Sequence, residues 1–507
     1  MSRRDELEGV IPGVPSLQSD PGDEPLTDAG NAERLVALYG TEILFVAELR
    51  AWLCWDGSRW ALDKTGEVFR RAKETARVMY HQAADLEGDK RRDLASWAMR
   101  SEAEPRIRAM VNLAKNEPGV TVTLDQLDRD PFLLSVENGT LNLRSGELRP
   151  AEQADLITRR APVTYDPAAT CPMWDAFLKR ILTGDADLIG FIQRAIGYSL
   201  TGLTVEQVIF LLHGLGANGK SVFLEVIRAL LGDYAAGADF STFLDRRQSG
   251  PRNDVARLLG RRYVTAVEAS DGERLAESLV KQLTGNDTVT ARHLYAESFE
   301  YRPTFKIWCA ANHKPTIRGT DHAIWRRIRL VPFTLTIPEH ERDPRLSEKL
   351  KAELSGILNW ALEGCRAWQR DGLGASPAVR QATADYRLDQ DTIGRFLDDC
   401  ARLTGTEESR TTAAELYQRY AAWTASNGEG RPLSQRRFGE SLNERGLDRI
   451  KTGGYVVWRG IELLPEGPGE GQMSLGGTSS IRPLMREYTK TAPSPSLPPS
   501  AELKVAS

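Results

Sequence analysis

The sequence predicts a multidomain α/β protein, with an α/β core, a mixed α+β domain before it, and a helical domain with a hairpin after it. Three observations predict this class. The chain has 507 residues, enough for roughly two to four domains of about 100–200 residues each. Hydrophobic residues make up 41% of it, an ordinary share for a globular protein. Short apolar runs alternate with helical patterns between residues 200 and 333, as in sheets that are covered by helices.

The charge balance and the cysteines exclude several classes of protein. There are 66 Lys and Arg against 70 Asp and Glu, which argues against a histone-like binder but permits a local basic groove. No apolar run approaches the ~18 residues of a membrane span, and the N-terminus lacks a signal-peptide core. The 5 cysteines lie far apart, so no zinc knuckle or disulfide framework is expected. We therefore expect a cytoplasmic protein with no membrane partner.

The N-terminal α+β domain is expected at residues 26–165. It follows a segment at 1–25 that is rich in Pro, Gly and acidic residues and is expected to be disordered. The pair Asp56-Gly57 lies among tryptophans and predicts a hairpin turn. The alternating run VENGTLNLRSGEL at 136–148 predicts short strands joined by turns.

The rest of the chain divides into a core, a linker, a small domain and a tail. The core is expected at 166–345, with a helical lead-in over 172–200 whose apolar residues share one face. An amphipathic helical linker is expected at 346–389, followed by three helices and a hairpin at 390–465. The Gly-, Ser- and Pro-rich tail at 466–507 is expected to be disordered.

The strongest signal is the segment GLGANGKS, which fits GxxxxGKS at every fixed position. It follows an apolar strand run and precedes a helical pattern that Gly232 ends. Glycines let the backbone N–H groups of such a loop surround a phosphate beside a helix N-terminus. Lys220 would contact the β- and γ-phosphates and Ser221 would ligate Mg²⁺. The alternative is a Gly-rich turn without a ligand. The predicted nucleotide-binding residues are Gly214, Leu215, Gly216, Ala217, Asn218, Gly219, Lys220 and Ser221.

An acidic residue follows the next predicted strand of this core. Glu268 ends the strand-like run at 263–267, and Asp271 comes three residues later. A P-loop ATPase needs a carboxylate near the magnesium ion and the attacking water, so Glu268 is expected to take part in Mg²⁺ binding. Asp271 is a candidate for a second acid. The alternative is that both residues are solvated strand-end carboxylates.

A polar residue also follows the strand FKIWCAA. Asn312 directly follows this run, and its amide could contact both the γ-phosphate and the lytic water. The alternative is a turn before Pro315. Cys309, inside the run, is expected to be a small core residue.

Three arginines accompany the last predicted strand. Arg326 and Arg327 precede it and Arg329 lies inside it. An arginine fork stabilises the negative charge that develops on a transferring phosphoryl group, so Arg326 or Arg327 is a candidate finger. Arg329 is expected to be structural, and salt bridging at a sheet edge is the alternative for all three.

Together, GLGANGKS, the segment VEASDGERLAESLVKQLTGNDTVTARHLYAESFEYRPTFKIWCAANHKP and IWRRIRLVPF closely resemble the superfamily 3 helicases. Among these the chain looks like the primase–helicase family of phages, plasmids and poxviruses. The resemblance covers roughly residues 26–335. It implies an α/β P-loop NTPase core of the AAA+-like type, in which GLGANGKS is Walker A, Glu268 the Walker B acid and Asn312 the sensor. It also implies that the arginine pair acts in trans between the subunits of a ring.

The resemblance further implies a DNA-contacting loop or hairpin in the segment KQLTGNDTVTARHLY. Lys281, Arg292 and His293 are the candidate contacts, because basic side chains suit phosphate contacts that do not read sequence. A solvated charged hairpin is the alternative.

Two features depart from the family pattern. Many superfamily 3 Walker B strands end in two adjacent acids, whereas Ala269 follows Glu268 here. The family also often carries an N-terminal primase domain, for which there is no room before residue 26. We therefore expect the helicase part of such a protein and no primase activity.

The C-terminal segment 390–465 is expected to be a winged helix. Between residues 431 and 459 it has seven Arg or Lys against three acids. Arg436 and Arg437, on the third predicted helix, are candidate DNA contacts. A winged helix that binds protein is the alternative.

The sequence thus predicts an ATP- and Mg²⁺-dependent DNA helicase for phage- or plasmid-type replication, working as a hexameric ring on single-stranded and forked DNA in a bacterial host. A separate primase is a potential partner. The alternatives are a P-loop ATPase that loads or packages DNA without unwinding it, and a nucleotide-switched initiator that binds DNA.

Overall fold

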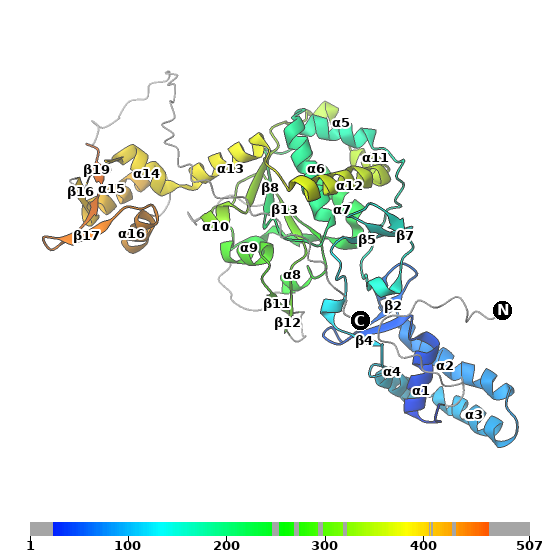
Figure 1. The fold of residues 1–507 in the computed structure, drawn as a ribbon. Helices are drawn as coiled ribbons and strands as arrows, with labels where there is room; N and C mark the ends of the chain where they lie inside the picture. The colour runs from blue at the N-terminus through cyan, green and yellow to red at the C-terminus, as the bar shows by residue number, and fades with distance from the viewer. Residues whose placement is uncertain are drawn as a thin grey trace, which may run out of the picture. The chain divides into compact units, whose positions relative to one another are not determined.

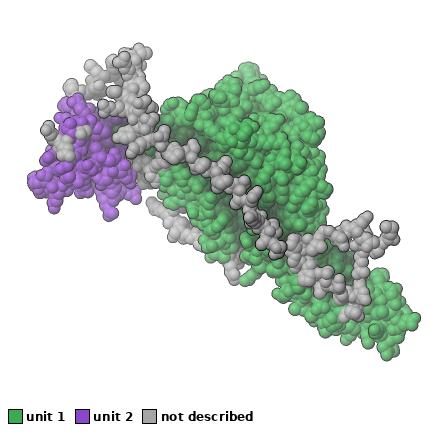
Figure 2. Space-filling view, in the orientation of Figure 1, with its two compact units in different colours: residues 1–395 green, residues 396–507 purple. Residues whose placement is uncertain are grey.

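The computed structural model describes residues 24–465, apart from 246–252, 268–272, 293–297, 318–321, 405, 407–408 and 428–431 (Figure 1). The chain divides into two compact units, residues 1–395 and 396–507, coloured separately in Figure 2. The segments expected to be disordered lie almost wholly outside the described residues. Within the described ranges, no helix is both long and apolar enough to cross a membrane.

The N-terminal part of the first unit combines a small mixed sheet with four helices. The sheet has the order β3-β2-β1-β4, in which β1 pairs with β2 antiparallel and with β4 parallel. The turn predicted at Asp56-Gly57 joins β2 to β3, and Gly57 has a φ of +95° there. The elements are α1 (Asp28–Tyr39), β1 (Ile43–Val46), β2 (Ala51–Trp55), β3 (Trp60–Leu62), α2 (Glu67–Ala84), α3 (Gly88–Ser101), α4 (Glu104–Ala114) and β4 (Thr121–Val122).

A second small sheet follows, made of β5 (Leu133–Val136), β6 (Gly139–Asn142) and β7 (Leu148–Arg149). Its strands coincide with the alternating run of the sequence, so this strand prediction is confirmed.

The centre of the first unit is a five-stranded sheet with the strand order β14-β8-β13-β10-β9, and its four strand pairings are all parallel. The strands β8, β10, β13 and β14 are mostly buried, as is typical of parallel sheets that helices cover, whereas the edge strand β9 is partly exposed (Figure 1). The predicted α/β core is therefore confirmed. The strands are β8 (Ile209–His213), β9 (Ala235–Asp239), β10 (Tyr263–Val267), β13 (Lys306–Ala311) and β14 (Ile328–Pro332).

The helices of this core include the expected helical lead-in and several shorter helices. Cys309 is fully buried in β13, as the sequence predicts. A hairpin of β11 (Val289–Arg292) and β12 (Ser298–Tyr301) lies between β10 and β13 in the sequence, and its residues Val289, Ala291 and Tyr301 are buried in the core. The helices are α5 (Pro172–Ile181), α6 (Ala186–Leu200), α7 (Lys220–Leu231), α8 (Asn253–Ala256), α9 (Glu277–Thr284), α10 (His322–Trp325), α11 (Leu346–Lys351), α12 (Leu354–Asp371) and α13 (Pro377–Gln390).

The segment expected as a linker, 346–389, is part of the folded core. Its longest helix, α12, packs along α6, and its apolar face lies in the same core cluster as Trp174 and Phe223. The contact is close because glycines meet at the crossing: a Cβ on Gly197 would lie 2.0 Å from the backbone N of Cys365. The amphipathic pattern predicted the helix, and burial of that face against α6 makes it a core element.

The first testable prediction concerns this crossing. Gly197→Ala is expected to destabilise the first unit by about 3 kcal/mol, because the added methyl group must separate two packed backbones. Gly190→Ala is the matched control in the same helix, since a Cβ there meets only the Arg194 guanidinium at 3.6 Å. The control is expected to stabilise the protein by about 0.5–1 kcal/mol. Thermal unfolding of the purified variants measures both; equal midpoints would contradict the close-packing account.

The second unit contains the three helices and the hairpin that the sequence predicts. Its core includes Tyr420 and Phe438, whose rings stack at 4.5 Å, and Ser434 caps the third helix as expected. The hairpin turns at Gly453-Gly454, both with positive φ. The elements are α14 (Thr392–Cys400), β15 (Ala401–Leu403), β16 (Arg410–Thr412), α15 (Ala413–Ser426), α16 (Gln435–Glu444), β17 (Arg449–Thr452), β18 (Tyr455–Arg459) and β19 (Ile461–Leu463).

Candidate nucleotide site

The glycine-rich loop connects the end of β8 at His213 to the start of α7 at Lys220. Its backbone needs left-handed conformations, with φ of +98° at Gly216 and +84° at Gly219. Gly214 is required for another reason, because a Cβ there would lie 2.2 Å from the carbonyl oxygen of Phe333. The fixed glycines of the motif therefore match steric demands of the loop.

The N-terminus of α7 lies at the end of this loop. Its N-cap is Gly219, so no side chain caps the first N–H groups of the helix. Such N–H groups are donors for an anion, and the helix dipole favours negative charge at this position. Ser221, in the first turn, is exposed. The loop thus has the features of a phosphate cradle.

Lys220 is buried and its ammonium group is held by three neutral oxygens. Its Nζ donates to the carbonyl of Gly214 at 2.7 Å, to Oδ1 of Asn218 at 3.1 Å and to Oδ1 of Asn312 at 3.3 Å. Burial lowers the pKa of Lys220, because the charged form is less well solvated there. None of these three acceptors carries a charge, so a phosphate oxygen would neutralise the ammonium group better than they do.

The contact between Lys220 and Asn312 follows from the order of the strands. β13 lies beside β8 in parallel register, with Ala311 opposite His213. Asn312 therefore lies just after the carboxyl end of β13, beside the point where β8 ends and the loop begins. Lys220 and Asn312, each expected from the sequence to contact the γ-phosphate, therefore lie within hydrogen-bonding distance of one another.

The end of β8 is electropositive. The pKa of His213 is lowered, first by burial and then by the nearby charges of Lys314 and Lys220. His213 is consequently neutral at neutral pH, and the two lysines supply the local positive charge. Lys314 also pairs with Asp389 of α13 at 2.9 Å. This field favours an anionic ligand.

A segment that sequence reasoning did not single out also lies against the loop. The N–H of Ile337 donates to the carbonyl of Ala217 at 2.7 Å, and Nδ2 of Asn218 donates to the carbonyl of Phe333 at 3.4 Å. Residues 333–337 thus hold the loop from the side of β14. These contacts use the backbone of residues 333–337, so no side-chain motif could have revealed them.

The predicted acids Glu268 and Asp271 lie outside the described residues. The strand before them ends at Val267, which pairs with Ala310 of β13. β10 is therefore separated from β8 by β13 alone. Within the described parts of the chain, no cluster of three or more His, Cys, Asp or Glu residues could hold a metal ion.

The arginine pair lies at the other end of the sheet. β14 is parallel to β8, with Ile328 opposite Ile209 and Pro332 opposite His213. Arg326 and Arg327 precede β14, so they lie near the start of β8, whereas the loop follows its end. Both donate to Oε1 of Gln207, Arg326 at 2.7 Å and Arg327 at 3.4 Å.

The arginines differ in exposure. Arg326 is exposed, whereas Arg327 is only 8% exposed and donates to the carbonyl of Ala323 at 2.6 Å. Arg329 donates to the carbonyl of Arg326 at 2.8 Å, in keeping with the structural role expected for it. Arg326 is thus the more accessible of the two candidate fingers.

The candidate DNA contacts lie on three elements. Arg292 is exposed at the end of β11, Lys281 lies in α9, and His293 is outside the described residues. Arg436 and Arg437 are exposed on α16 in the second unit, where Arg436 pairs with Glu440 at 2.9 Å. In both regions the predicted residues include exposed basic side chains.

The second testable prediction concerns Asn312. If its amide orients the lytic water, Asn312→Ala is expected to reduce ATP hydrolysis by about 10²-fold with less effect on nucleotide binding. Steady-state hydrolysis and equilibrium binding of a fluorescent ATP analogue measure the two effects. Asn112→Ala, on the surface of α4, is the control. Unchanged hydrolysis in Asn312→Ala would refute the sensor assignment.

Comparison with known proteins finds two family models that match the first unit, and viral relatives that are named as helicases or primases. Residues 32–183 match the family model described as D5 N terminal like, and residues 212–327 match a family of unknown function. The chain is 28% identical over 331 residues to a protein named "Putative helicase" of Acanthamoeba polyphaga mimivirus, covering 61% of this chain and 34% of that one.

Two further relatives are similar over comparable lengths. A "Putative helicase" of Frog virus 3 is 26% identical, covering 60% of this chain and 40% of that one. A "Putative primase" of African swine fever virus is 25% identical, covering 75% of this chain and 43% of that one. This chain thus spans less than half the length of these curated relatives. Among solved structures, the apo C-terminal region of NrS-1 superposes with a TM-score of 0.49 at 11% identity, covering 84% of this chain and 97% of that one.

Proposed function

We propose that this chain, a member of the primase–helicase family, is an ATP-dependent DNA helicase. It would bind ATP at residues 214–221 and couple hydrolysis between the subunits of a ring to movement along single-stranded DNA during replication. The observation that carries the proposal is the contact of Lys220 with Asn312, 92 residues later, at the glycine-rich loop. A lysine and an amide that meet beside a helix N-terminus are the groups that phosphoryl transfer needs.

The site fits a nucleoside triphosphate with magnesium. The N–H groups at the start of α7 would bind the β-phosphate, and the Lys220 ammonium would bridge the β- and γ-phosphates. Ser221 and Glu268 would hold Mg²⁺, which neutralises the charge of the phosphates. The amide N–H of Asn312 would donate to a γ-phosphate oxygen, and its Oδ1 would accept from the attacking water.

The position of the arginine pair supports a ring. A five-residue strand is about 17 Å long, so Arg326 and Arg327 cannot reach the loop of their own chain without a large rearrangement. A second subunit could present Arg326 to that loop, as in enzymes whose finger is supplied in trans. We propose a hexamer for the ring, by resemblance to the family.

DNA would be contacted by two regions. The β11–β12 hairpin, which carries Arg292, would enter the ring pore and contact backbone phosphates. The second unit would bind duplex or forked DNA as a winged helix, through Arg436 and Arg437 of α16 and the β17–β18 hairpin. Tyr455 in this hairpin is 70% exposed, so its ring is available for stacking on a base.

Two other functions remain distinguishable. An ATPase that loads or packages DNA would use the same nucleotide site without separating strands. A nucleotide-switched initiator would bind DNA through the second unit with negligible turnover, which the separate compact unit and the exposed Arg436 and Arg437 would favour. Both differ from a helicase in the product of the reaction.

A fork assay decides among the three. Wild-type protein with ATP, Mg²⁺ and a labelled fork is expected to displace one strand and to hydrolyse ATP faster when DNA is present. DNA-stimulated hydrolysis without displacement would favour loading or packaging. Binding of ATP and DNA with no stimulated hydrolysis would favour the initiator.

A further inference from the structure

A cavity apart from the nucleotide site lies beside the edge strand β9. It has a volume of about 500 Å³ and is lined by β9, by the turn after α8, and by residues from the N-terminal half of the unit. None of its lining residues belongs to the loop 214–221. Three arginines line it, namely Arg159, Arg257 and Arg261. The wall formed by β9 consists mainly of alanine and glycine, which leaves room for a ligand.

Two of the arginines are held by backbone carbonyls at this wall. Arg159 donates to the carbonyl of Leu259 at 3.1 Å, and Arg261 donates to the carbonyl of Asp233. Gly260, between Leu259 and Arg261, has a φ of +69°, and a Cβ there would lie 3.3 Å from the guanidinium of Arg159. A glycine at this turn therefore lets the two arginine side chains lie close together.

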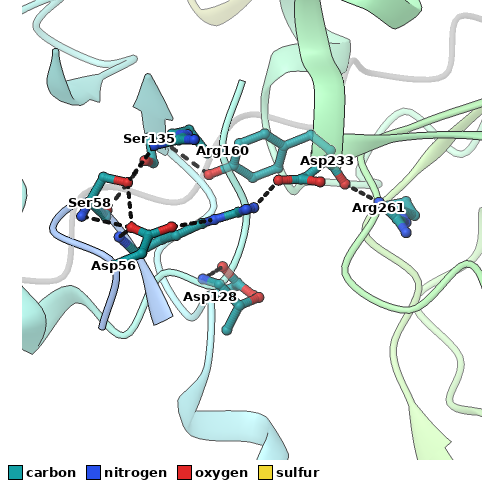
Figure 3. A network of polar contacts seen from close by, with 10 residues as sticks. Asp56, Ser58, Asp128, Ser135, Arg160, Asp233 and Arg261 are labelled. Atoms are coloured by element: carbon teal, nitrogen blue, oxygen red, sulfur yellow. Dashed lines mark hydrogen bonds and ion pairs between the residues drawn. The ribbon is translucent and has the colours of Figure 1, made fainter. Parts of the chain in front are cut away.

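The carboxylate of Asp233, whose carbonyl Arg261 contacts, is engaged with another residue. The side chain of Asp233 pairs with Arg59, and Figure 3 shows this ion pair and Arg261 in a network that reaches Asp56 and Ser58. Among the described residues, the hydrogen bond of Arg261 is made to the neutral carbonyl of Asp233. The network fixes the position of Arg261 without neutralising it.

Two acids line the cavity, Asp239 and Asp254, and a third, Asp128, lies near Arg159. Asp239 accepts from the N–H of Ser241 at 2.8 Å, and Asp254 accepts from the N–H of Val255 at 3.1 Å. Asp128, whose charge partly offsets that of Arg159, accepts from the N–H of Thr158 at 2.8 Å. Each of these carboxylates accepts a backbone N–H.

The arginines repel one another. Burial, Arg159 and Arg257 together lower the pKa of Arg261 to about 10. Burial also lowers the pKa of Arg159. A bound anion would offset this repulsion and raise the pKa values of Arg159 and Arg261 again. The electrostatic energy of the three arginines therefore favours binding of an anion.

We infer that this cavity binds a phosphate group through Arg159, Arg257 and Arg261. Planar guanidinium groups match the oxygens of a phosphate, and three of them around one cavity suit a dianion or a phosphodiester. The phosphate could belong to single-stranded DNA or to a free anion such as pyrophosphate. The site is distinct from the proposed ATP site and does not depend on hydrolysis.

Arg257 is the residue to test. It is exposed on the turn after α8, so Arg257→Gln removes a charge from the cavity without removing a backbone contact from the core. Arg91→Gln, on exposed α3, is the charge-matched control. The full-length protein is used with the ATP site saturated by a non-hydrolysable ATP analogue and Mg²⁺. Binding of a labelled oligo-dT strand is followed by anisotropy at several salt concentrations, and binding of pyrophosphate by calorimetry.

The two sources of phosphate give different results. If the ligand is DNA, Arg257→Gln weakens oligo-dT binding by about tenfold, and the slope of log affinity against log salt falls by about 0.7. If the ligand is a free anion, only the pyrophosphate affinity falls, by a similar factor. The inference is overturned if neither affinity changes, or if Arg91→Gln has an equal effect. Arg159→Lys keeps the positive charge but loses the two-pronged guanidinium group. This variant is expected to weaken binding of the same ligand that Arg257→Gln affects.

Discussion

Lys220→Ala is expected to abolish strand displacement and to lower ATP hydrolysis by at least about 10²-fold. The ammonium group of Lys220 is buried, and among the described residues it donates to neutral oxygens of the loop and of Asn312. When a triphosphate is bound, this charge would stabilise the oxygens on which negative charge develops, and removal of one such donor costs about 10²–10³ in rate. Steady-state hydrolysis with and without DNA, together with the fork assay, measures the effect.

The control for this variant is Lys90→Ala, which removes an exposed lysine from α3. It is expected to behave as wild type in both assays. Lys220→Ala is expected to remain folded, since the loop is held by backbone contacts with Phe333 and Ile337, which circular dichroism can check. A folded Lys220→Ala protein with normal hydrolysis would refute the assignment of the ATP site.

If Arg326 is the finger, Arg326→Ala is expected to lower ATP hydrolysis by about 10³-fold. A neighbouring subunit with an intact Arg326 is then expected to restore hydrolysis. Arg326 lies at the opposite end of the sheet from the loop of its own chain. In a mixture with Lys220→Ala, an interface with an intact loop on one side and an intact arginine on the other can form. With equal amounts and random assembly in a ring, about a quarter of the interfaces would have both.

The mixing experiment therefore has a quantitative outcome. Each variant alone is inactive, and the mixture recovers up to about a quarter of the wild-type hydrolysis per subunit if the interfaces act independently. No recovery after co-refolding or prolonged exchange would contradict a finger in trans. Arg327→Ala serves to distinguish a loss of stability from a loss of catalysis. Its buried side chain contacts the carbonyl of Ala323, so this variant is expected to lower the unfolding temperature, whereas Arg326→Ala is not.

Several features of the fold could be predicted because they depend on neighbours in the chain. The strand–loop–helix unit around GLGANGKS is determined by an apolar run, by glycines at φ values of +98° and +84°, and by a helical period. The helices and the hairpin of residues 390–465 follow from caps and turn residues such as Ser434 and Gly453-Gly454. Local steric and hydrogen-bonding preferences suffice for these elements.

Other predictions depended on how segments pack, and the sequence could not decide them. Residues 346–389 read as a linker, because an amphipathic pattern does not reveal what covers its apolar face. The structure buries that face against α6, where Gly197 permits the contact. The roles of Glu268 and Asp271 stay predictions, since both lie outside the described residues.

The sequence by itself determined the loop, its lysine and the strand ends that carry Asn312 and the arginines. Only the tertiary structure decided which of these meet. Parallel pairing of β13 with β8 brings Asn312 to Lys220, and the same register at β14 carries Arg326 to the far end of the sheet. The arginine cavity, where Arg159 meets Arg261, has no sequence signature at all. The physical reason is that strand order and register arise from side-chain burial between distant segments, which no local pattern specifies.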